Sequence, residues 1–185
     1  MLHLIIGGAR SGKSNFALQQ ALNLSQQSGK NVTFVATATA TDTEMAKRIM
    51  RHQQERPDHW ALAEVPLNLT EYIEQYSDKD ATTDNEQAIL LIDCLTLWLN
   101  NQLYHQPQQD FSMLFQGFIQ ALRTSKSSVI MVANEVGLGI IPMGDVTRKF
   151  VDQAGWLNQA VASIADQVTF VAAGLPMALK RPQGE

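Results

Sequence analysis

Short apolar runs alternate with longer amphipathic segments along the whole chain. Runs rich in β-branched and aliphatic residues have the length of buried strands at Leu2–Ile6, Val32–Ala36, Ala61–Val65, Ala88–Ile92, Val129–Ala133 and Gln167–Ala172. Between them the apolar spacing predicts helices over about Lys13–Gln27, Asp42–Arg56, Leu67–Tyr76, Leu95–Tyr104, Phe111–Thr124 and Val146–Ala165. Strands that alternate with helices are typical of an α/β fold around a mostly parallel sheet. No repeat or compositional break divides the chain, so we expect one domain over residues 1–185.

Composition narrows the class of protein. The chain has 185 residues, of which 45% are hydrophobic and 17% charged, as in soluble globular proteins. Its formal net charge of −4 provides no global basic field, so we expect no nucleic-acid partner. The single cysteine, Cys94, excludes an intramolecular disulfide. No signal peptide or transmembrane run is recognisable, and we expect a cytoplasmic location. The polar stretch Ser77–Glu86 predicts an exposed, mobile loop.

The strongest motif is "GGARSGKS", Gly7–Ser14, which satisfies G-x-x-x-x-G-K-[ST]. A predicted strand precedes it and a predicted helix follows, as the motif requires. Its glycines allow backbone N–H groups to converge on phosphate oxygens, and a lysine reaches the β- and γ-phosphates. A plain glycine turn would need neither Lys13 nor Ser14. We therefore expect a P-loop NTPase-type domain, RecA-like, with helices flanking the sheet.

Two further strand ends carry polar residues. "AILLIDCLT" ends a strand on Asp93, where a carboxylate is placed to hold Mg²⁺; the alternative is an ordinary helix cap. Cys94 beside it is better explained as a buried small residue than as a nucleophile. "NEVGLGIIP" follows another strand, and Asn134 and Glu135 either contact substrate or metal or simply form a turn.

His52 lies in "RIMRHQQERP", where Arg48 and Arg56 bracket it at intervals of four residues. All three share one face of the predicted helix, and two guanidiniums beside an imidazole would suit a polyphosphate. Their positive field also favours neutral imidazole, the form able to attack phosphorus. The alternative is a solvated helix face with an incidental histidine, which Glu55 supports by offering a plain salt-bridge partner.

A resemblance brings these motifs together. The chain resembles the bifunctional adenosylcobinamide kinase / adenosylcobinamide-phosphate guanylyltransferase family of cobalamin biosynthesis. The shared segments cover nearly its whole length: "GGARSGKS", "VATA", "DTEMAKRIMRHQQERPDHW", "AEVPLNL", "LLIDCLTLWLNN", "NEVGLGIIP" and "RKFVDQAGWLNQAVA". Many families share a P-loop, whereas D-x-E-M-x-x-R-I-x-x-H-x-x-x-R and N-E-V-G-x-G-I-x-P are far more specific.

The resemblance implies a role for each site residue. The histidine that such enzymes guanylylate corresponds to His52. Nucleotide contacts are expected at Gly7, Gly8, Ala9, Arg10, Ser11, Gly12, Lys13, Ser14, Thr37, Ala38, Thr39, Gln53, Gln54, Glu55, Arg56, Glu64 and Asp93. Ser14 and Asp93 are the expected Mg²⁺ ligands. The loosely constrained "TATAT" after Ala36 suggests that Ala38 and Thr39 contribute backbone atoms only.

The implied chemistry has two halves. ATP or GTP gives its γ-phosphoryl group to the aminopropanol hydroxyl of adenosylcobinamide, and His52 then relays GMP from GTP to the new phosphate, with loss of pyrophosphate. The resemblance also implies a homotrimer. The rival interpretation is a P-loop small-molecule kinase without guanylyl transfer. A GTPase switch is disfavoured because [NT]-K-x-D is absent and Asp152–Gly155, the only D-x-x-G, lies in a helical pattern.

Overall fold

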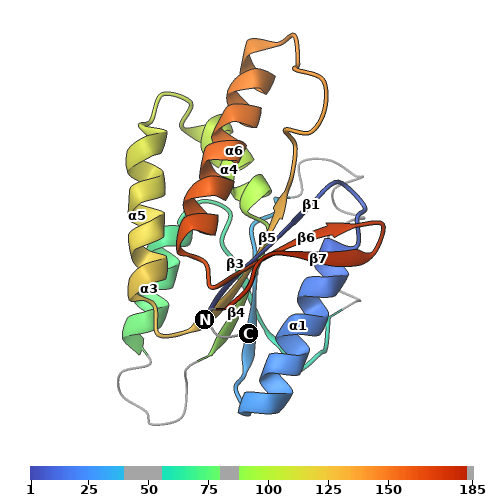
Figure 1. The fold of residues 1–185 in the computed structure, drawn as a ribbon. Helices are drawn as coiled ribbons and strands as arrows, with labels where there is room; N and C mark the ends of the chain where they lie inside the picture. The colour runs from blue at the N-terminus through green and yellow to red at the C-terminus, as the bar shows by residue number, and fades with distance from the viewer. Residues whose placement is uncertain (40–55, 80–87, 183–185) are drawn as a thin grey trace.

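A computed structural model describes residues 1–39, 56–79 and 88–182 of the chain. Its centre is a seven-stranded sheet in the order β3-β2-β4-β5-β1-β6-β7 (Figure 1). The strands are β1 (Leu2–Gly7), β2 (Val32–Ala36), β3 (Ala61–Glu64), β4 (Ile89–Asp93), β5 (Ser128–Asn134), β6 (Gln167–Ala172) and β7 (Leu175–Lys180). All neighbouring pairs are parallel except β6 and β7. The carboxyl ends of β1 to β6 therefore meet at one edge of the sheet, where ligands of open α/β sheets bind.

Helices cover both faces of this sheet, and each face has its own core. The described helices are α1 (Lys13–Ser28), α3 (Leu69–Lys79), α4 (Leu95–His105), α5 (Phe111–Thr124) and α6 (Asp145–Ile164). One core contains Trp98, Phe118 and Leu157, and it joins α3 to α6 with the sheet. The other contains Ala17, Leu18 and Ala21 of α1, packed on Phe34 and Ile89. Of the described helices, Figure 1 shows α1 on one side of the sheet and α3, α4, α5 and α6 together on the opposite side.

The predicted strands are confirmed, with ends shifted by a residue at most. The apolar runs of β1, β2, β4 and β5 are largely buried on both faces, whereas β3 at the edge of the sheet is mostly exposed. The predicted helix Asp42–Arg56 lies outside the described residues except for its last member. The polar stretch Ser77–Glu86 was wrongly assigned at its start, because α3 continues to Lys79.

The sequence pattern missed β7. This strand returns antiparallel to β6 through a tight turn at Ala173 and Gly174, both with positive φ. Leu175, Met177 and Leu179 do alternate with smaller or polar residues, as in a strand, but the run is short and all its residues are exposed. Pro176 lies within it, as is permitted on an edge strand. In the described part of the chain, no helix is both long and apolar enough to cross a membrane.

Candidate nucleotide site

The glycine-rich turn between β1 and α1 has the backbone of an anion-binding nest. Arg10 and Gly12 have φ values of 55° and 92°, so left-handed residues recur two positions apart in the turn. Such alternation makes successive N–H groups converge, and α1 begins immediately afterwards with the N–H groups of its first turn still to be satisfied. Both features place positive potential where a phosphate would lie.

Glycine is required at both fixed positions of the motif. A Cβ atom at Gly7 would lie 2.3 Å from the carbonyl oxygen of Val171 and 2.7 Å from Ser11 Oγ. A Cβ atom at Gly12 would lie 3.2 Å from Gly174 Cα, and the φ of Gly12 already favours glycine. The end of β6 and the turn after it therefore pack directly against the P-loop at Gly7 and Gly12.

Lys13 folds back over this turn. Its side chain is only 9% exposed, and its Nζ donates to the Gly8 carbonyl at 3.0 Å. Burial lowers the pKa of Lys13 from its ordinary value, while Cys94 and Asp93 act in the opposite direction. Burial, together with the charge of Asp93, also raises the pKa of the Cys94 thiol to about 12, so the thiol is neutral near neutral pH. The P-loop lysine thus lies beside the carboxylate expected at the magnesium site.

The helix-cap explanation for Asp93 does not fit. Asp93 is the last residue of β4, and the residue at the N-cap of α4 is Cys94, joined to Asp93 by a cis peptide bond. The side chain of Cys94 forms no capping hydrogen bond. Cys94 itself is buried and its thiol stays protonated, as expected for a packing residue and not for a nucleophile.

Thr37 joins the ends of β2 and β4. Its side chain is fully buried, and its hydroxyl donates to the Cys94 carbonyl at 2.7 Å while accepting from the Cys94 N–H at 2.8 Å. Its own N–H donates to the Asp93 carbonyl at 3.3 Å. Both hydrogen bonds of the hydroxyl therefore go to the backbone of Cys94, the residue that follows Asp93. Ala38 and Thr39, which follow it, are half-buried.

Polar side chains of α4 hold three strand ends in place, and sequence reasoning missed them. Thr96 Oγ1 accepts from the Asn134 N–H at 2.6 Å, at the end of β5. Asn101 Nδ2 donates to the carbonyls of Thr37 and Pro66, after β2 and β3, at 2.9 and 3.0 Å. Thr96 and Asn101 are both buried, in a helix whose Leu95, Trp98 and Leu99 belong to the core. A buried polar residue in such a helix is itself a sign of a specific partner.

Only part of the predicted histidine region can be placed. His52, Gln53, Gln54 and Glu55 lie outside the described residues, as does Arg48. Arg56 is described, and its guanidinium carbon lies 4.5 Å above the centre of the Phe34 ring. Burial lowers the pKa of Arg56, and the charge of Glu64 opposes this effect. Arg56 and Glu64, two of the expected nucleotide contacts, therefore lie close enough to interact at the β2–β3 side of the ligand edge.

The segment after β5 starts beside the P-loop and then becomes exposed. The Glu135 N–H donates to the Gly7 carbonyl at 3.0 Å, and the Glu135 carboxylate accepts from the Gly137 N–H at 2.7 Å. This second bond directly supports the turn interpretation for Glu135. Farther on, Ile140 and Met143 are 97% and 96% exposed.

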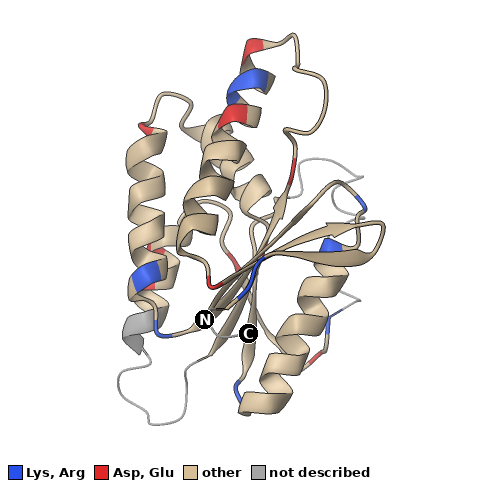
Figure 2. Ribbon diagram, in the orientation of Figure 1, with Lys and Arg blue, Asp and Glu red and all other residues tan. Residues whose placement is uncertain are grey.

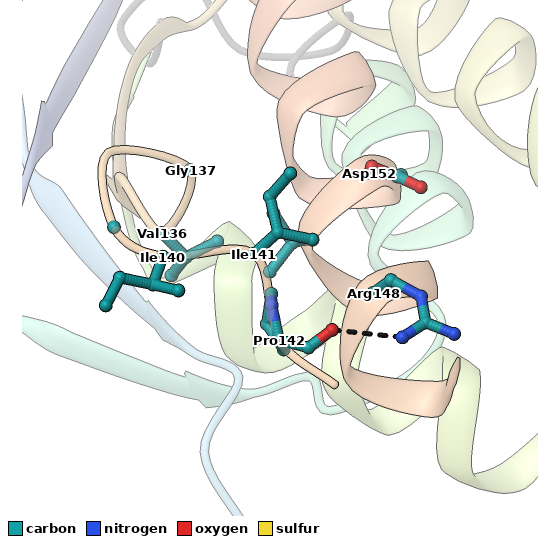
Figure 3. Close-up of a pocket in the computed structure, with 9 residues that line it drawn as sticks. Val136, Gly137, Ile140, Ile141, Pro142, Arg148 and Asp152 are labelled. Carbon is teal, nitrogen blue, oxygen red and sulfur yellow. Dashed lines mark hydrogen bonds between the residues drawn. The ribbon is translucent and has the colours of Figure 1, made fainter. Parts of the chain in front are cut away.

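A shallow pocket of about 110 Å³ lies between this segment and α6 (Figure 3). Arg148 of α6 donates to the Pro142 and Met143 carbonyls and pairs with Asp145, so one guanidinium fixes the end of the segment. Charges of both signs occupy the first turns of α6 (Figure 2). The pocket is separate from the phosphate nest, although the segment that lines it begins there.

The remaining histidines of the described residues have structural or solvated positions, as predicted. His3 is 3% exposed, and its Nε2 lies 2.9 Å from Thr169 Oγ1. Burial lowers its pKa to about 4, so it is neutral near neutral pH. His59 and His105 are exposed.

The comparisons with known proteins agree with this geometry. Residues 3–179 match the family model described as cobinamide kinase / cobinamide phosphate guanyltransferase. The chain belongs to this family. It is 42% identical over 180 residues to the bifunctional adenosylcobalamin biosynthesis protein CobP of Pseudomonas aeruginosa, covering 97% of this chain and 98% of that one. It is 34% identical over 193 residues to the bifunctional protein CobU of Escherichia coli, covering 97% and 100%.

Solved structures of lower identity support the fold. One solved ATPase domain superposes with a TM-score of 0.61 at 15% identity, over 99% of this chain and 78% of that one. The flagellar accessory protein FlaH of Methanocaldococcus jannaschii superposes with a TM-score of 0.54 at 16% identity, over 98% and 78%. The predicted P-loop fold with a mostly parallel sheet is therefore confirmed, and the cobinamide kinase / guanyltransferase family is confirmed through the sequence relatives.

Proposed function

We propose that this chain phosphorylates the aminopropanol hydroxyl of adenosylcobinamide and then attaches GMP from GTP to the resulting phosphate. The observation that carries the proposal is a P-loop nest with Lys13 beside Asp93, in a chain that matches bifunctional relatives over nearly its full length. A kinase without guanylyl transfer is less well supported, because the CobP and CobU relatives are both described as bifunctional.

In the kinase half the chain supplies positioning and charge. The N–H groups of Gly7–Ser14 would hold the phosphates, and the Lys13 ammonium would leave Gly8 to contact the β- and γ-phosphates. Ser14, in the first turn of α1, and Asp93, which acts on Lys13 across the cradle, are suitable oxygen donors for Mg²⁺. A magnesium ion bound there would neutralise phosphate charge. P-loop sites need few protein ligands for it, because phosphate and water supply the rest.

In the guanylyltransferase half His52 would act as nucleophile. A ring nitrogen of His52 attacks the α-phosphorus of GTP, the bond from that phosphorus to the bridging oxygen breaks, and pyrophosphate leaves. The phosphate of the corrinoid product then attacks the same phosphorus, and the phosphorus–nitrogen bond breaks. One difficult transfer thus becomes two easier displacements. Arg56 and Glu64, which interact at the β2–β3 edge, and the residues expected at 37–39 and 53–55 would bind the nucleotide.

Labelled GTP tests the proposal. Label from α-labelled GTP should remain on wild-type protein through denaturing electrophoresis, and label from γ-labelled GTP should not. The bond should break in acid and survive mild base, as expected for a phosphoramidate. His52→Ala should lose the label and all guanylyl transfer, yet still phosphorylate adenosylcobinamide, because the γ-phosphoryl passes directly to the hydroxyl.

His59→Ala is the matched control, since His59 is exposed and lies a few residues after His52 in the chain. It should be labelled like the wild type. Undiminished α-label on His52→Ala protein would reject the assignment of the nucleophile. The choice of ATP or GTP for phosphorylation, a homotrimeric assembly and a cytoplasmic location stay predictions from the sequence.

A further inference from the structure

The turn between β6 and β7 lies directly against the P-loop. Ala173 and Gly174 have φ values of 52° and 78°, the two left-handed residues of a tight hairpin turn. The Gly174 N–H donates to the Ser11 carbonyl at 2.8 Å. Gly174 Cα also lies 3.2 Å from the position of a Cβ atom at Gly12. The turn and the P-loop are thus in contact at a hydrogen bond and at a close approach of the Gly174 backbone to Gly12.

This hydrogen bond sets the direction of one peptide group. The Ser11 carbonyl and the Gly12 N–H belong to the same planar peptide and point in opposite directions. Since the carbonyl points at Gly174, the Gly12 N–H points away from the turn, on the side of the nest. A reversed peptide would present the carbonyl oxygen to the phosphates and would repel them.

We propose that Gly174 is a positioning residue for nucleotide binding, which holds the Ser11–Gly12 peptide in the orientation that binds phosphate. The inference rests on the proposed use of Gly7–Ser14 as the phosphate cradle. Gly174 acts through Ser11 and contacts no substrate. Neither the P-loop motif nor the pattern of the missed strand β7 indicates this role, because the two segments lie at opposite ends of the chain.

The structure separates the two properties of Gly174 that matter. A Cβ atom at Gly174 would meet nothing within 4 Å, so there is room for a side chain. What the site requires is a left-handed φ and a backbone N–H. Asparagine provides both, because it tolerates the left-handed region better than other residues with a side chain. Proline provides neither, because it lacks the N–H and its φ is fixed near −65°.

The test compares the binding of inorganic tripolyphosphate and of Mg–GTP by isothermal titration calorimetry in Gly174→Asn and Gly174→Pro proteins. Gly174→Asn should bind both within about twofold of the wild type. Gly174→Pro should bind both roughly tenfold more weakly, the loss typical of one misplaced hydrogen-bonding group. In steady-state assays the KM for nucleotide should rise more than kcat falls.

A backbone substitution keeps the test valid should Gly174→Pro fail to fold. Residues 173–185 can be joined by chemical ligation with an ester in place of the Ala173–Gly174 amide, which removes the N–H and preserves the turn. Cysteine at the ligation site is desulfurised to the native Ala173, and Cys94 becomes alanine in the same step. The all-amide protein prepared identically is therefore the control. The ester protein should lose the same roughly tenfold in tripolyphosphate affinity.

A purely structural role would lower the melting temperature of the ester protein and leave tripolyphosphate affinity unchanged at low temperature, and that result would overturn the inference. Lys13→Ala distinguishes this failure from failure of the cradle. If Lys13→Ala binds tripolyphosphate weakly while the ester protein binds it as tightly as its control, only the role of Gly174 is rejected. Full binding by Lys13→Ala would reject the phosphate cradle on which the inference depends.

Discussion

Replacing Thr37 by valine would remove the side-chain link between the ends of β2 and β4 with almost no change in side-chain shape. The Thr37 hydroxyl donates to the Cys94 carbonyl and accepts from the Cys94 N–H, at 2.7 and 2.8 Å. Thr37 is fully buried, so water cannot take the place of the lost hydroxyl without rearrangement. The Cys94 carbonyl would keep a partner, because the Trp98 N–H also donates to it at 3.2 Å. The Cys94 N–H would lose the Thr37 hydroxyl, which accepts its hydrogen bond.

The two lost contacts therefore have different energies. Leaving a buried N–H without a partner costs about 1–3 kcal/mol, whereas a hydrogen bond to a carbonyl that keeps another donor is worth about 0.5–1.5 kcal/mol. Together they predict that Thr37→Val lowers the free energy of unfolding by roughly 2–4 kcal/mol. Thr37→Ser keeps the hydroxyl and loses one methyl group, which costs about 1 kcal/mol.

Urea denaturation of both variants, followed by circular dichroism, measures these differences as shifts of the midpoint at constant slope. Nucleotide affinity should fall in Thr37→Val, because Asp93 and Cys94 are adjacent, and should be nearly unchanged in Thr37→Ser. Thr37→Val protein as stable as Thr37→Ser would show that the two hydrogen bonds do not hold this edge of the sheet. Weak nucleotide binding by a fully stable Thr37→Val protein would instead indicate a direct contact of the hydroxyl with the ligand.

Lys13→Ala should reduce both phosphoryl and guanylyl transfer by roughly 10²-fold or more, because both use one triphosphate cradle; rates near wild type in the two assays would contradict the P-loop assignment. Asp93→Asn keeps the shape of the side chain and removes its charge, so turnover should need a higher Mg²⁺ concentration, and an unchanged Mg²⁺ titration would remove Asp93 from the metal site. For His3, the folded-state pKa of about 4 lies below the ordinary value of 6.5, so the unfolded chain binds the proton first as the pH falls. The free energy of unfolding should decrease by roughly 3 kcal/mol between pH 6.5 and 4 and should decrease less in His3→Gln, which urea denaturation across that range would measure.

Local chemistry in the sequence was enough to predict most of the scaffold. The P-loop motif requires a strand before it and a helix after it, and both are present at Leu2–Gly7 and Lys13–Ser28. The buried strands β4 and β5 were predictable because a continuous apolar run of that length suits few other structures. The end of an apolar strand was correctly expected at Asp93, and because parallel strands end at one edge, Asp93 lies within electrostatic range of Lys13.

What the sequence did not indicate depends on contacts between distant segments. Thr37 was expected among the nucleotide contacts, which stays a prediction, and nothing in the sequence indicated that its hydroxyl bonds to Cys94, 57 residues away. Asn101 was unremarkable in a helical pattern, and its partners after β2 and β3 become apparent only when α4 packs over the strand ends. β7 is short, exposed throughout and contains Pro176, so its weak alternation was not enough to predict a strand. The role of His52 stays a prediction, since the residue lies outside the described part of the chain.

The position of β1 in the sheet has a consequence for the order in which the protein can fold during synthesis. β1 is made first among the strands, yet its neighbours are β5 and β6, with Leu2 opposite Val129 and His3 opposite Gln167. Loop closure over such a separation is slow, and it cannot start before the ribosome has released the partner strand. The β6–β7 turn that supports the P-loop is made later still. A nascent chain ending before Asn134 therefore contains the whole P-loop sequence and has no folded site able to hold a triphosphate.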